Sequence, residues 1–344
     1  MSETYKFAAI QRTAVTNIPL PTESDSARGF ITYGTDNLYP QFLLSLSETS
    51  TTLSSALKGV KDYVLGDKII DNITGEEVDY DTYCLIDNIV TDYLTFGGFA
   101  LNPIRNRFGG LATVRYVNFE RLRTNKEKSV FWYSEDWTKS YGRVKSTRYN
   151  RWDPEGADGS SIYYYSKSRT GVYPSPIWSS AVESCIIEEK VNKFHLNGIS
   201  SGFSSSAIIS FNNGVPSDEQ KAEIERNFEE KFTGEDNTGR VLLSFSDDKE
   251  HAPEITTLDT TDFSDKYTAA VDRCRENILL SFRCTSNLLG LQKEGIGFNT
   301  QEYQSSFKLF QKTVVTPIQK NFERELKQFG IDIHIVPFSI SFES

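Results

Sequence analysis

The chain has 344 residues, of which 38% are apolar, 13% aromatic and 24% charged. This composition is typical of ordered proteins and excludes wholesale disorder, and the length favours an elongated protomer with subdomains over one compact ball. The formal net charge is −10, with 47 acids and 37 bases, and neither sign is gathered into a long block. Proteins that grip DNA tightly usually present a basic face that neutralises phosphates, and we find no sign of such a face.

No apolar run approaches the roughly 18 residues that a membrane span needs. The opening residues MSETYKFAAIQRTA lack the basic flank and apolar core of a signal peptide. We therefore expect a soluble protein without a membrane partner, made and retained in the cytosol. Cys84, Cys185, Cys274 and Cys284 are widely separated and form no CxxC pair, which favours buried thiols over disulfides or a zinc site.

The first third of the chain predicts an arm and two helices. Residues 1–32 are rich in Ser, Thr and Pro without a steady period, which is typical of an extended arm. Apolar residues at helical spacing predict a helix over 51–65, stopped at Gly66, and a second helix from about residue 83 that ends at Gly97. The run NITG at 72–75 predicts a hairpin between them.

Residues 97–173 predict an antiparallel sheet, because short aromatic or β-branched segments alternate with turns such as RFGG and DPEG. The run Tyr163, Tyr164, Tyr165 suggests two roles. Exposed tyrosines in a groove would stack on bases, as in proteins that bind single strands. In an alternating strand, however, Tyr164 faces one way and its neighbours the other, which favours packing in a core or an interface.

The middle of the chain predicts a long helix followed by a β-α-β unit. Ser175 and Pro176 are a suitable N-cap and first turn for a helix that runs towards Gly198, and its apolar residues spread over more than one face. The strands SAIISF and RVLLSF then flank a helix at about 217–233. Eight acids and three bases between 218 and 236 give that helix region a net charge of −5, on a solvent or partner face.

The last third predicts two helices around a loop. Apolar residues at steps of three and four predict a helix from Thr261, and three glycines make the segment from Cys284 to Phe298 a flexible loop. The final long helix is capped by Asn299, and Pro317 inside it predicts a kink near 313–317 because proline removes a backbone hydrogen bond. The closing residues IDIHIVPFSISF predict a strand.

The sequence offers no catalytic, cofactor or metal site. Neither GxxxxGK[ST] nor GxGxxG occurs, and the three histidines, His195, His251 and His334, stand in no spacing that suggests a triad or a metal site. Adjacent carboxylates on a helix diverge by about 100°, so Glu188 with Glu189, and Glu229 with Glu230, are interpreted as parts of solvated faces.

Five segments in this order resemble the portal proteins of long-tailed bacteriophages. They are YGTDNLYPQFLLSL, YPSPIWSSAVESCIIEEKVNKFHLNGISSGFSSSAIISF, PSDEQKAEIERNFEEKFTGEDNTGRVLLSF, ILLSFRCTSNLLGL and FNTQEYQSSFKLFQKTVVTPIQKNFERELKQFG. The resemblance covers residues 33–330. Where many members of the family have a proline before Leu-Leu-Gly, this chain has Thr285, Ser286 and Asn287.

The resemblance implies an α+β portal fold with a reduced or absent crown. After the arm at 1–32, the implied parts are a wing at 33–173 and 300–330, stem helices at 174–202 and 258–283, a β-α-β clip at 203–257, a tunnel loop at 284–299, and a C-terminal strand at 331–344. The family assembles as a twelve-subunit ring at one capsid vertex, which conducts double-stranded DNA during packaging and ejection. Its implied partners are the large terminase, the major capsid protein and the head-tail connector.

The resemblance also assigns residues to roles in the virion, where the ring resides after assembly in the host cytoplasm. Gly290, Lys293, Glu294, Gly295 and Gly297 would line the DNA channel as the tunnel loop, and Pro317 would kink the wing helix. Docking of the motor or connector would fall to four acids of the clip helix: Asp218, Glu225, Glu229 and Glu230. A merely solvated helix explains these acids as well.

Two other functions stay open. The first is a capsid or tail component of another kind. The second is a metal-dependent nucleic-acid enzyme built on the sheet at 97–173, which would need clustered carboxylates for two metals. Asp87, Asp92 and Asp153 form no such motif in the sequence, so the portal function is preferred.

Overall fold

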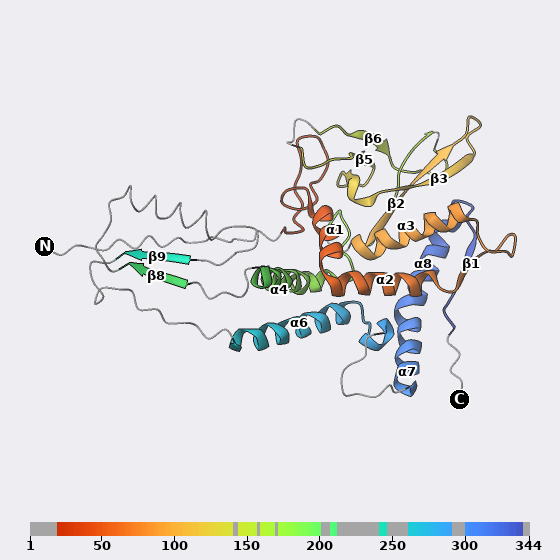
Figure 1. Ribbon diagram of the computed structural model, residues 1–344. Helices are drawn as coiled ribbons and strands as arrows, with labels where there is room; N and C mark the ends of the chain where they lie inside the picture. The colour runs from red at the N-terminus through yellow and green to blue at the C-terminus, as the bar shows by residue number, and fades with distance from the viewer. Residues whose placement is uncertain are drawn as a thin grey trace. The chain divides into compact units, whose positions relative to one another are not determined.

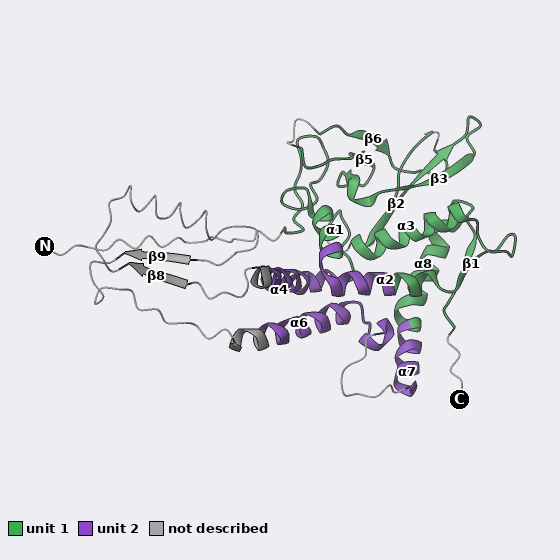
Figure 2. Cartoon of the chain, in the orientation of Figure 1, with its two compact units in different colours: residues 1–47, 60–177, 311–344 green, residues 48–59, 178–310 purple. Residues whose placement is uncertain are grey.

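The computed structural model describes residues 19–139, 144–156, 159–168, 171–200, 207–211, 241–245, 261–290 and 300–339. The contacts divide the chain into two compact units (Figure 2). Unit 1 comprises residues 1–47, 60–177 and 311–344, and unit 2 comprises 48–59 and 178–310. Each unit therefore gathers segments that are far apart in the sequence. Figure 1 labels the helices and strands.

Unit 1 combines helices with small antiparallel sheets. Its helical elements are most of α1 (Tyr39–Thr49), the second part of α2 (Thr51–Leu65), α3 (Tyr80–Phe96), a 3-10 turn (Phe119–Arg121) and α8 (Thr316–Lys327). One sheet has the order β3-β2-β7, formed by Leu111–Val117, Gly98–Arg105 and Tyr163–Ser166. A second has the order β4-β5-β6, formed by Leu122–Thr124, Val130–Tyr133 and Thr147–Asn150. Finally, β1 (Lys68–Asp71) pairs antiparallel with β10 (Ile333–Val336).

The core of unit 1 lies on both faces of the first sheet. On one face, Tyr165 stacks on Phe99 with ring centroids 4.9 Å apart and donates a hydrogen bond to Asn321 of α8 at 3.0 Å. On the other face, Tyr164 stacks on Phe119 with centroids 5.1 Å apart. The strand therefore alternates as predicted, and these tyrosines pack in the core.

Several predicted elements of unit 1 are confirmed. The helix over 51–65 is α2, and Gly66 follows it with a left-handed φ of 70°. α3 ends at Gly97, whose φ of 84° suits only glycine without strain. A bridge between Ile70 and Glu77 closes the predicted hairpin at 72–75. The single sheet expected at 97–173 is wrong, because the 3-10 turn after β3 leads the chain into a second sheet.

The described part of the predicted N-terminal arm, residues 19–32, contains no helix and packs on unit 1. Phe30 is 2% exposed, and the Ile31 N–H donates to the Thr124 carbonyl at 2.8 Å. The Glu23 carboxylate accepts the N–H groups of Val172 and Tyr173 at 2.8 Å each. These contacts hold the segment on unit 1, while residues 1–18 lie outside the described part. The helix α1 was not predicted, although Pro40 in its first turn suits a helix start.

Unit 2 is mainly helical in its described residues. It contains a 3-10 turn (Ser179–Ala181), α4 (Val182–Ser200), α6 (Thr261–Ser281), the 3-10 turn η3 (Ser286–Leu289) and α7 (Thr300–Phe310). The strands β8 (Ala207–Phe211) and β9 (Val241–Phe245) pair in parallel, as a β-α-β unit requires. The predicted connecting helix at 217–233 lies outside the described residues.

The predicted helix start at Ser175 and Pro176 is wrong. Helical structure begins only at Ser179, because tertiary contacts hold the preceding residues in another conformation. The Pro174 carbonyl, for example, accepts a hydrogen bond from the Tyr33 hydroxyl at 2.8 Å.

The long C-terminal helix is interrupted where a kink was predicted. Between α7 and α8, residues Gln311–Val315 form a π-helical segment, and Pro317 stands in the first turn of α8. Proline lacks an N–H and crowds the carbonyl four residues earlier, and a wider turn before it relieves both effects. The interruption is confirmed in this form.

Candidate functional site

The two sites predicted from the sequence lie mostly outside the described residues. This holds for Lys293, Glu294, Gly295 and Gly297 of the tunnel loop. It holds also for the four acids of the clip helix: Asp218, Glu225, Glu229 and Glu230. Of the predicted site residues, the structure places Gly290 and Pro317.

The first residues of the predicted tunnel loop, 284–290, are described by the structure and are held by contacts, so the flexible loop expected from Cys284 is wrong for these residues. The Cys284 N–H donates to the Leu279 carbonyl at 3.0 Å and closes the end of α6. Leu288 in the turn η3 is buried. Gly290 ends this turn with φ 73°, and a Cβ there would meet no atom within 4 Å, so backbone conformation alone requires the glycine.

Gly59 lets α2 approach this turn closely. A side chain at Gly59 would overlap the side chain of Leu289. Both residues belong to unit 2. The turn is therefore packed closely against α2.

α4 and α6 pack against each other through buried thiols and apolar side chains. Cys185 of α4 and Cys274 and Ile278 of α6 are buried, and Asn277 donates to the Ser184 hydroxyl at 3.3 Å. All four cysteines of the chain are free, as predicted, and three of them are buried. Burial raises the pKa of the Cys185 thiol to about 12, so this thiol is protonated and unreactive at neutral pH.

Both helices also expose large apolar side chains. Ile187 and Phe194 are exposed seven residues apart on α4, a spacing that places them on one helix face. Leu196 on α4 and Leu280 on α6 are exposed as well, Leu280 by 73%. Phe194 also packs against Tyr267 of α6, with ring centroids 4.9 Å apart. Large exposed apolar side chains of this kind are suited to burial against a partner.

A buried carboxylate holds the beginning of α2. Glu188 of α4 is 4% exposed and accepts a hydrogen bond from the Ser50 hydroxyl. It also accepts the Thr52 N–H at 3.2 Å and the Thr52 hydroxyl at 2.6 Å. A negative charge at a helix N-terminus is favourable because it meets free N–H groups and the positive end of the dipole. The interpretation of Glu188 as part of a solvated face is therefore wrong.

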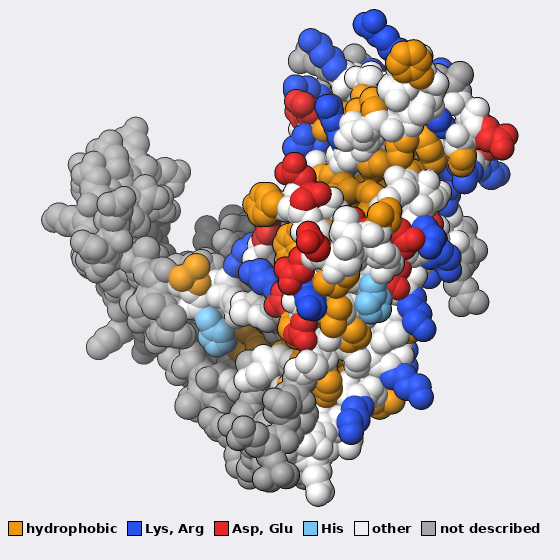
Figure 3. Space-filling view, turned by 90° about the vertical axis from the view of Figure 1, so that its right-hand side faces the viewer, with side chains coloured by type: hydrophobic (Ala, Val, Ile, Leu, Met, Phe, Trp, Pro, Cys, Tyr) orange, Lys and Arg blue, Asp and Glu red, His pale blue; other side chains and the backbone are white. Residues whose placement is uncertain are grey.

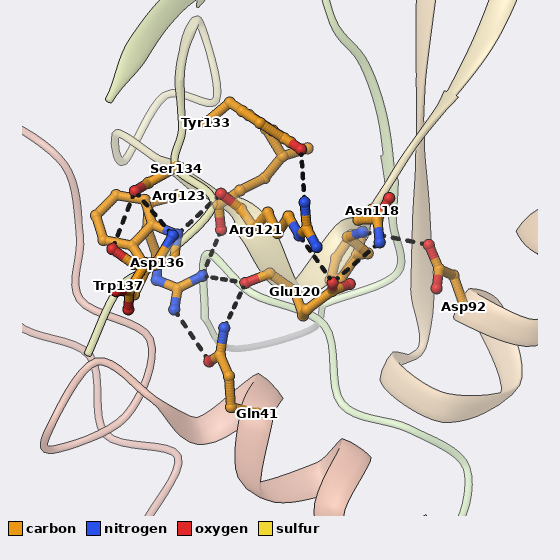
Figure 4. A network of polar contacts seen from close by, with 12 residues as sticks. Gln41, Asp92, Asn118, Glu120, Arg121, Arg123, Tyr133, Ser134, Asp136 and Trp137 are labelled. Atoms are coloured by element: carbon orange, nitrogen blue, oxygen red, sulfur yellow. Dashed lines mark hydrogen bonds and ion pairs between the residues drawn. The ribbon is translucent and has the colours of Figure 1, made fainter. Parts of the chain in front are cut away.

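Arg123 of β4 is the centre of a buried polar network in unit 1 (Figure 4). Its guanidinium donates to the Asn37 side chain at 2.6 Å, to the Leu122 carbonyl at 2.7 Å and to the Glu120 carbonyl at 3.0 Å. It also lies 4.7 Å from the centroid of the Trp137 ring. These acceptors are neutral, so burial lowers the pKa of Arg123 to about 10. The network joins the segment before α1 to the second sheet and contains no reactive group.

The three aspartates that an enzyme would need have separate environments. Asp92 is buried, and burial raises its pKa well above the usual range, although Tyr116 hydrogen bonding opposes this. Asp87 pairs with Lys61 at 3.0 Å, and Asp153 is exposed. Among the described residues, no group of three His, Cys, Asp or Glu side chains is placed to hold a metal ion. No helix in this part of the chain is long and apolar enough to cross a membrane.

Acidic and basic residues are concentrated in different stretches of unit 1, although neither kind forms an unbroken block. Residues 62–92 contain nine acids and one base, a net charge of −8. Residues 93–169 contain fourteen bases and seven acids, a net charge of +7, and the first acid among them is Glu120. Figure 3 shows Lys and Arg side chains gathered over the sheets at the top of the view. Counting charge by region would have revealed this in the sequence.

Comparisons with known proteins find the fold but no sequence family. No family model matches the chain, and no curated protein matches it. A chain in the neck of the empty gene transfer agent (GTA) particle, computed with C6 symmetry, is 15% identical with a TM-score of 0.51, over 87% of this chain and 85% of that chain. This protein shares the fold of a GTA neck chain.

Two further solved structures are similar. A chain in the neck of the native GTA particle, computed with C12 symmetry, is 16% identical with a TM-score of 0.50, over 87% of this chain and 84% of that one. An HK97-family phage portal protein from Corynebacterium diphtheriae is 10% identical with a TM-score of 0.47, over 85% and 94%. The α+β fold expected from the sequence is confirmed, and it is shared with the two GTA neck chains; at these identities the likeness shows the fold alone.

Proposed function

We propose that the chain is the subunit of a portal ring at one vertex of a phage-like capsid, through which double-stranded DNA passes during packaging and ejection. The fold carries this proposal, because it is shared over 87% of the chain with a chain of the GTA neck. One such neck was computed with C12 symmetry, which supports a ring of twelve. The ring would assemble in the host cytoplasm and reside in the virion, in contact with the major capsid protein.

The exposed apolar side chains of unit 2 support an oligomer. Ile187 and Phe194 on α4 and Leu280 on α6 would be costly to expose in a lone protomer and are suited to burial between neighbouring subunits. Electron microscopy of the purified protein tests the ring directly. A capsid or tail component of another kind would form no ring with a central channel.

Mostly acidic side chains would line the DNA path and would bind the duplex only weakly. Twelve protomers of net charge −10 would surround the duplex, and each lysine or arginine paired with a phosphate would add binding free energy that every step of DNA movement must overcome. Within the tunnel loop, Lys293 is the single base and Glu294 the single acid. Contact there would be local, and the glycines would let the loop follow the duplex.

DNA packaging with purified rings tests the tunnel loop. Deletion of residues 290–297 should reduce the packaged DNA, and Lys293→Glu should change packaging velocity. Lys145→Glu makes the same charge change at an exposed site of unit 1 and serves as the control. Unchanged packaging by both the deletion and Lys293→Glu would contradict the assignment of the loop.

The acidic clip helix would dock the large terminase and, after filling, the head-tail connector. Its candidate contacts are Asp218, Glu225, Glu229 and Glu230. Reversing the last three to lysine should abolish terminase binding to the ring, measured by biolayer interferometry. Reversal of the exposed acids Glu127 and Glu155 is the control. Intact binding of the triple variant would identify the clip helix as a solvated face.

We assign no catalytic role to the chain. The chains that share its fold are parts of a particle neck. The carboxylates that a two-metal enzyme would use are divided among a buried group at Asp92, an ion pair at Asp87 and an exposed site at Asp153. Nuclease assays of the purified rings with Mg²⁺ should therefore show no DNA cleavage.

A further inference from the structure

The turn between β2 and β3 is built rigidly and presents an aromatic side chain to solvent. The Asn106 side-chain oxygen accepts the N–H groups of Phe108 at 2.9 Å and Gly110 at 3.0 Å. Arg105 donates to the Gly109 carbonyl at 2.8 Å. Phe108 is nevertheless 97% exposed. A fixed turn that holds a large apolar side chain in water gains nothing for the fold of the protomer itself.

Arg105 ties this turn to the rest of unit 1. Its guanidinium donates to the Asp153 carbonyl at 2.7 Å and lies 4.4 Å from the centroid of the Trp152 ring. The turn is therefore ordered before any partner binds, which lowers the entropic cost of association. Pre-ordered aromatic side chains of this kind are typical anchors of protein interfaces.

The charged residues of the hairpin itself are all basic. β2, β3 and their turn contain Arg105, Arg107 and Arg115 and no acid. Arg107 and Arg115 are exposed, and neither forms an ion pair with another described residue. The partner of this surface should therefore combine apolar side chains with negative charge.

Such a surface occurs elsewhere on the same chain, at the turn after β1 and the first turn of α3. Ile73 is 76% exposed and Tyr80 is 79% exposed. The acids Glu76 and Glu77 lie between them in the sequence and are exposed, as is Asp81. This acidic surface, residues 71–83, thus combines exposed apolar side chains with charges of one sign, as the hairpin does, but its charges are negative.

We propose that the β2–β3 hairpin of one subunit binds the acidic surface of a neighbouring copy of this chain, with Phe108 packing against Ile73 and Tyr80. The proposal rests on the proposed function, because it names a contact between ring subunits. A closed ring needs two different, complementary surfaces on each protomer. Protomers of net charge −10 repel one another, so local charge pairing is what would bring them together.

Assembly of charge-reversed variants tests this contact. Arg107→Glu with Arg115→Glu, and separately Glu76→Lys with Glu77→Lys, should each raise the concentration needed for half-maximal assembly about thirtyfold, as for loss of an interface anchor. Mass photometry measures this concentration. Phe108→Ser should have a similar effect, and Phe108→Trp should retain assembly because it keeps an aromatic anchor.

Two combinations make the test specific. A mixture of the two charge-reversed proteins should assemble, because subunits that alternate around a ring restore opposite charges at every contact. One chain carrying all four reversals should assemble for the same reason. Lys126→Glu with Lys145→Glu changes the same number of exposed bases outside the hairpin and should assemble like the wild type.

The outcomes separate this contact from the proposed function. Wild-type rings that are unaffected by every variant would overturn the contact and leave the portal function standing. The same conclusion follows if the variant rings form normally but fail to enter capsids, since the hairpin would then bind another protein. A wild type that does not self-associate would overturn both proposals. Loss of assembly without rescue by mixing would also overturn the charge pairing.

Discussion

The two units differ in the contacts that their buried polar and exposed apolar side chains make. Unit 1 pairs its largest buried polar group, Arg123, with several acceptors, and Tyr33 stacks on Tyr173 with ring centroids 4.0 Å apart. Other buried polar atoms of unit 1, such as the Tyr164 hydroxyl and the Trp152 indole nitrogen, have no hydrogen-bond partner among the described residues. The described helices of unit 2 pack through buried thiols and apolar side chains and through the carboxylate of Glu188, and they expose apolar side chains such as Ile187 and Leu280. We infer that unit 1 is stable as a protomer, whereas unit 2 depends on neighbouring subunits.

Replacement of Arg123 should have the largest effect on the free energy of unfolding. Arg123→Met removes a buried donor from the Leu122 and Glu120 carbonyls and from the Asn37 side chain, which should cost about 3 kcal/mol. Urea unfolding followed by tryptophan fluorescence measures this. Arg148→Met is the control, because Arg148 is exposed on the same sheet and should change stability by less than about 0.5 kcal/mol. Equal losses would contradict the role of the network.

Replacement of Glu188 should lower the free energy of unfolding by less than replacement of Arg123, and its effect should fall on unit 2. Glu188→Ala removes the acceptor for the first turn of α2 and should cost about 2 kcal/mol. Hydrogen exchange should then accelerate at the N–H of Thr52. The adjacent Glu189→Ala loses only an exposed ion pair with Lys193, worth about 0.5 kcal/mol. If the two variants behave alike, Glu188 does not hold the helix.

Asp92 should give unit 1 a pH-dependent stability. Because its pKa is raised in the folded protein, the folded state binds a proton more tightly than the unfolded chain, and stability falls as pH rises from 3.8 towards the raised pKa. Asp92→Asn removes this fall, so the variant should gain stability relative to wild type as pH increases. Thermal unfolding between pH 4 and 8 measures the difference. Parallel pH profiles would contradict a raised pKa.

The exposed side chains of α4 should have the smallest effect on protomer stability. Ile187→Ser with Leu196→Ser should change the free energy of unfolding by less than about 0.5 kcal/mol, because both side chains are already largely in water. The same variant should assemble poorly, which sedimentation velocity measures. A large loss of stability with normal assembly would contradict the inference that unit 2 depends on neighbouring subunits.

Local signals in the sequence predicted much of the fold. Helix periodicity and the stops at Gly66 and Gly97 placed α2 and the end of α3, and Pro317 marked the interruption of the last helix. The resemblance of segments in the correct order indicated an α+β fold of this kind, which the chain shares with a chain of the GTA neck. These signals arise from residues that are close together in the chain, so they can be recognised from the sequence alone.

Contacts between residues far apart in the chain could not be predicted from the sequence. Glu188 looked like one of two solvated carboxylates because its partners Ser50 and Thr52 lie 138 and 136 residues away. Arg123 likewise depends on Asn37, 86 residues earlier. The start of α4 was misplaced because a remote tyrosine, Tyr33, holds the Pro174 carbonyl. The predicted tunnel loop and clip sites remain predictions, since they lie largely outside the described residues.

Electron microscopy of the purified full-length protein, paired with native mass spectrometry, tests the central claim most directly. We predict rings with an open central channel and a mass of about twelve protomers of 39.0 kDa each. Protomers that stay monomeric at micromolar concentration, or that form filaments or closed assemblies without a channel, would contradict the portal function.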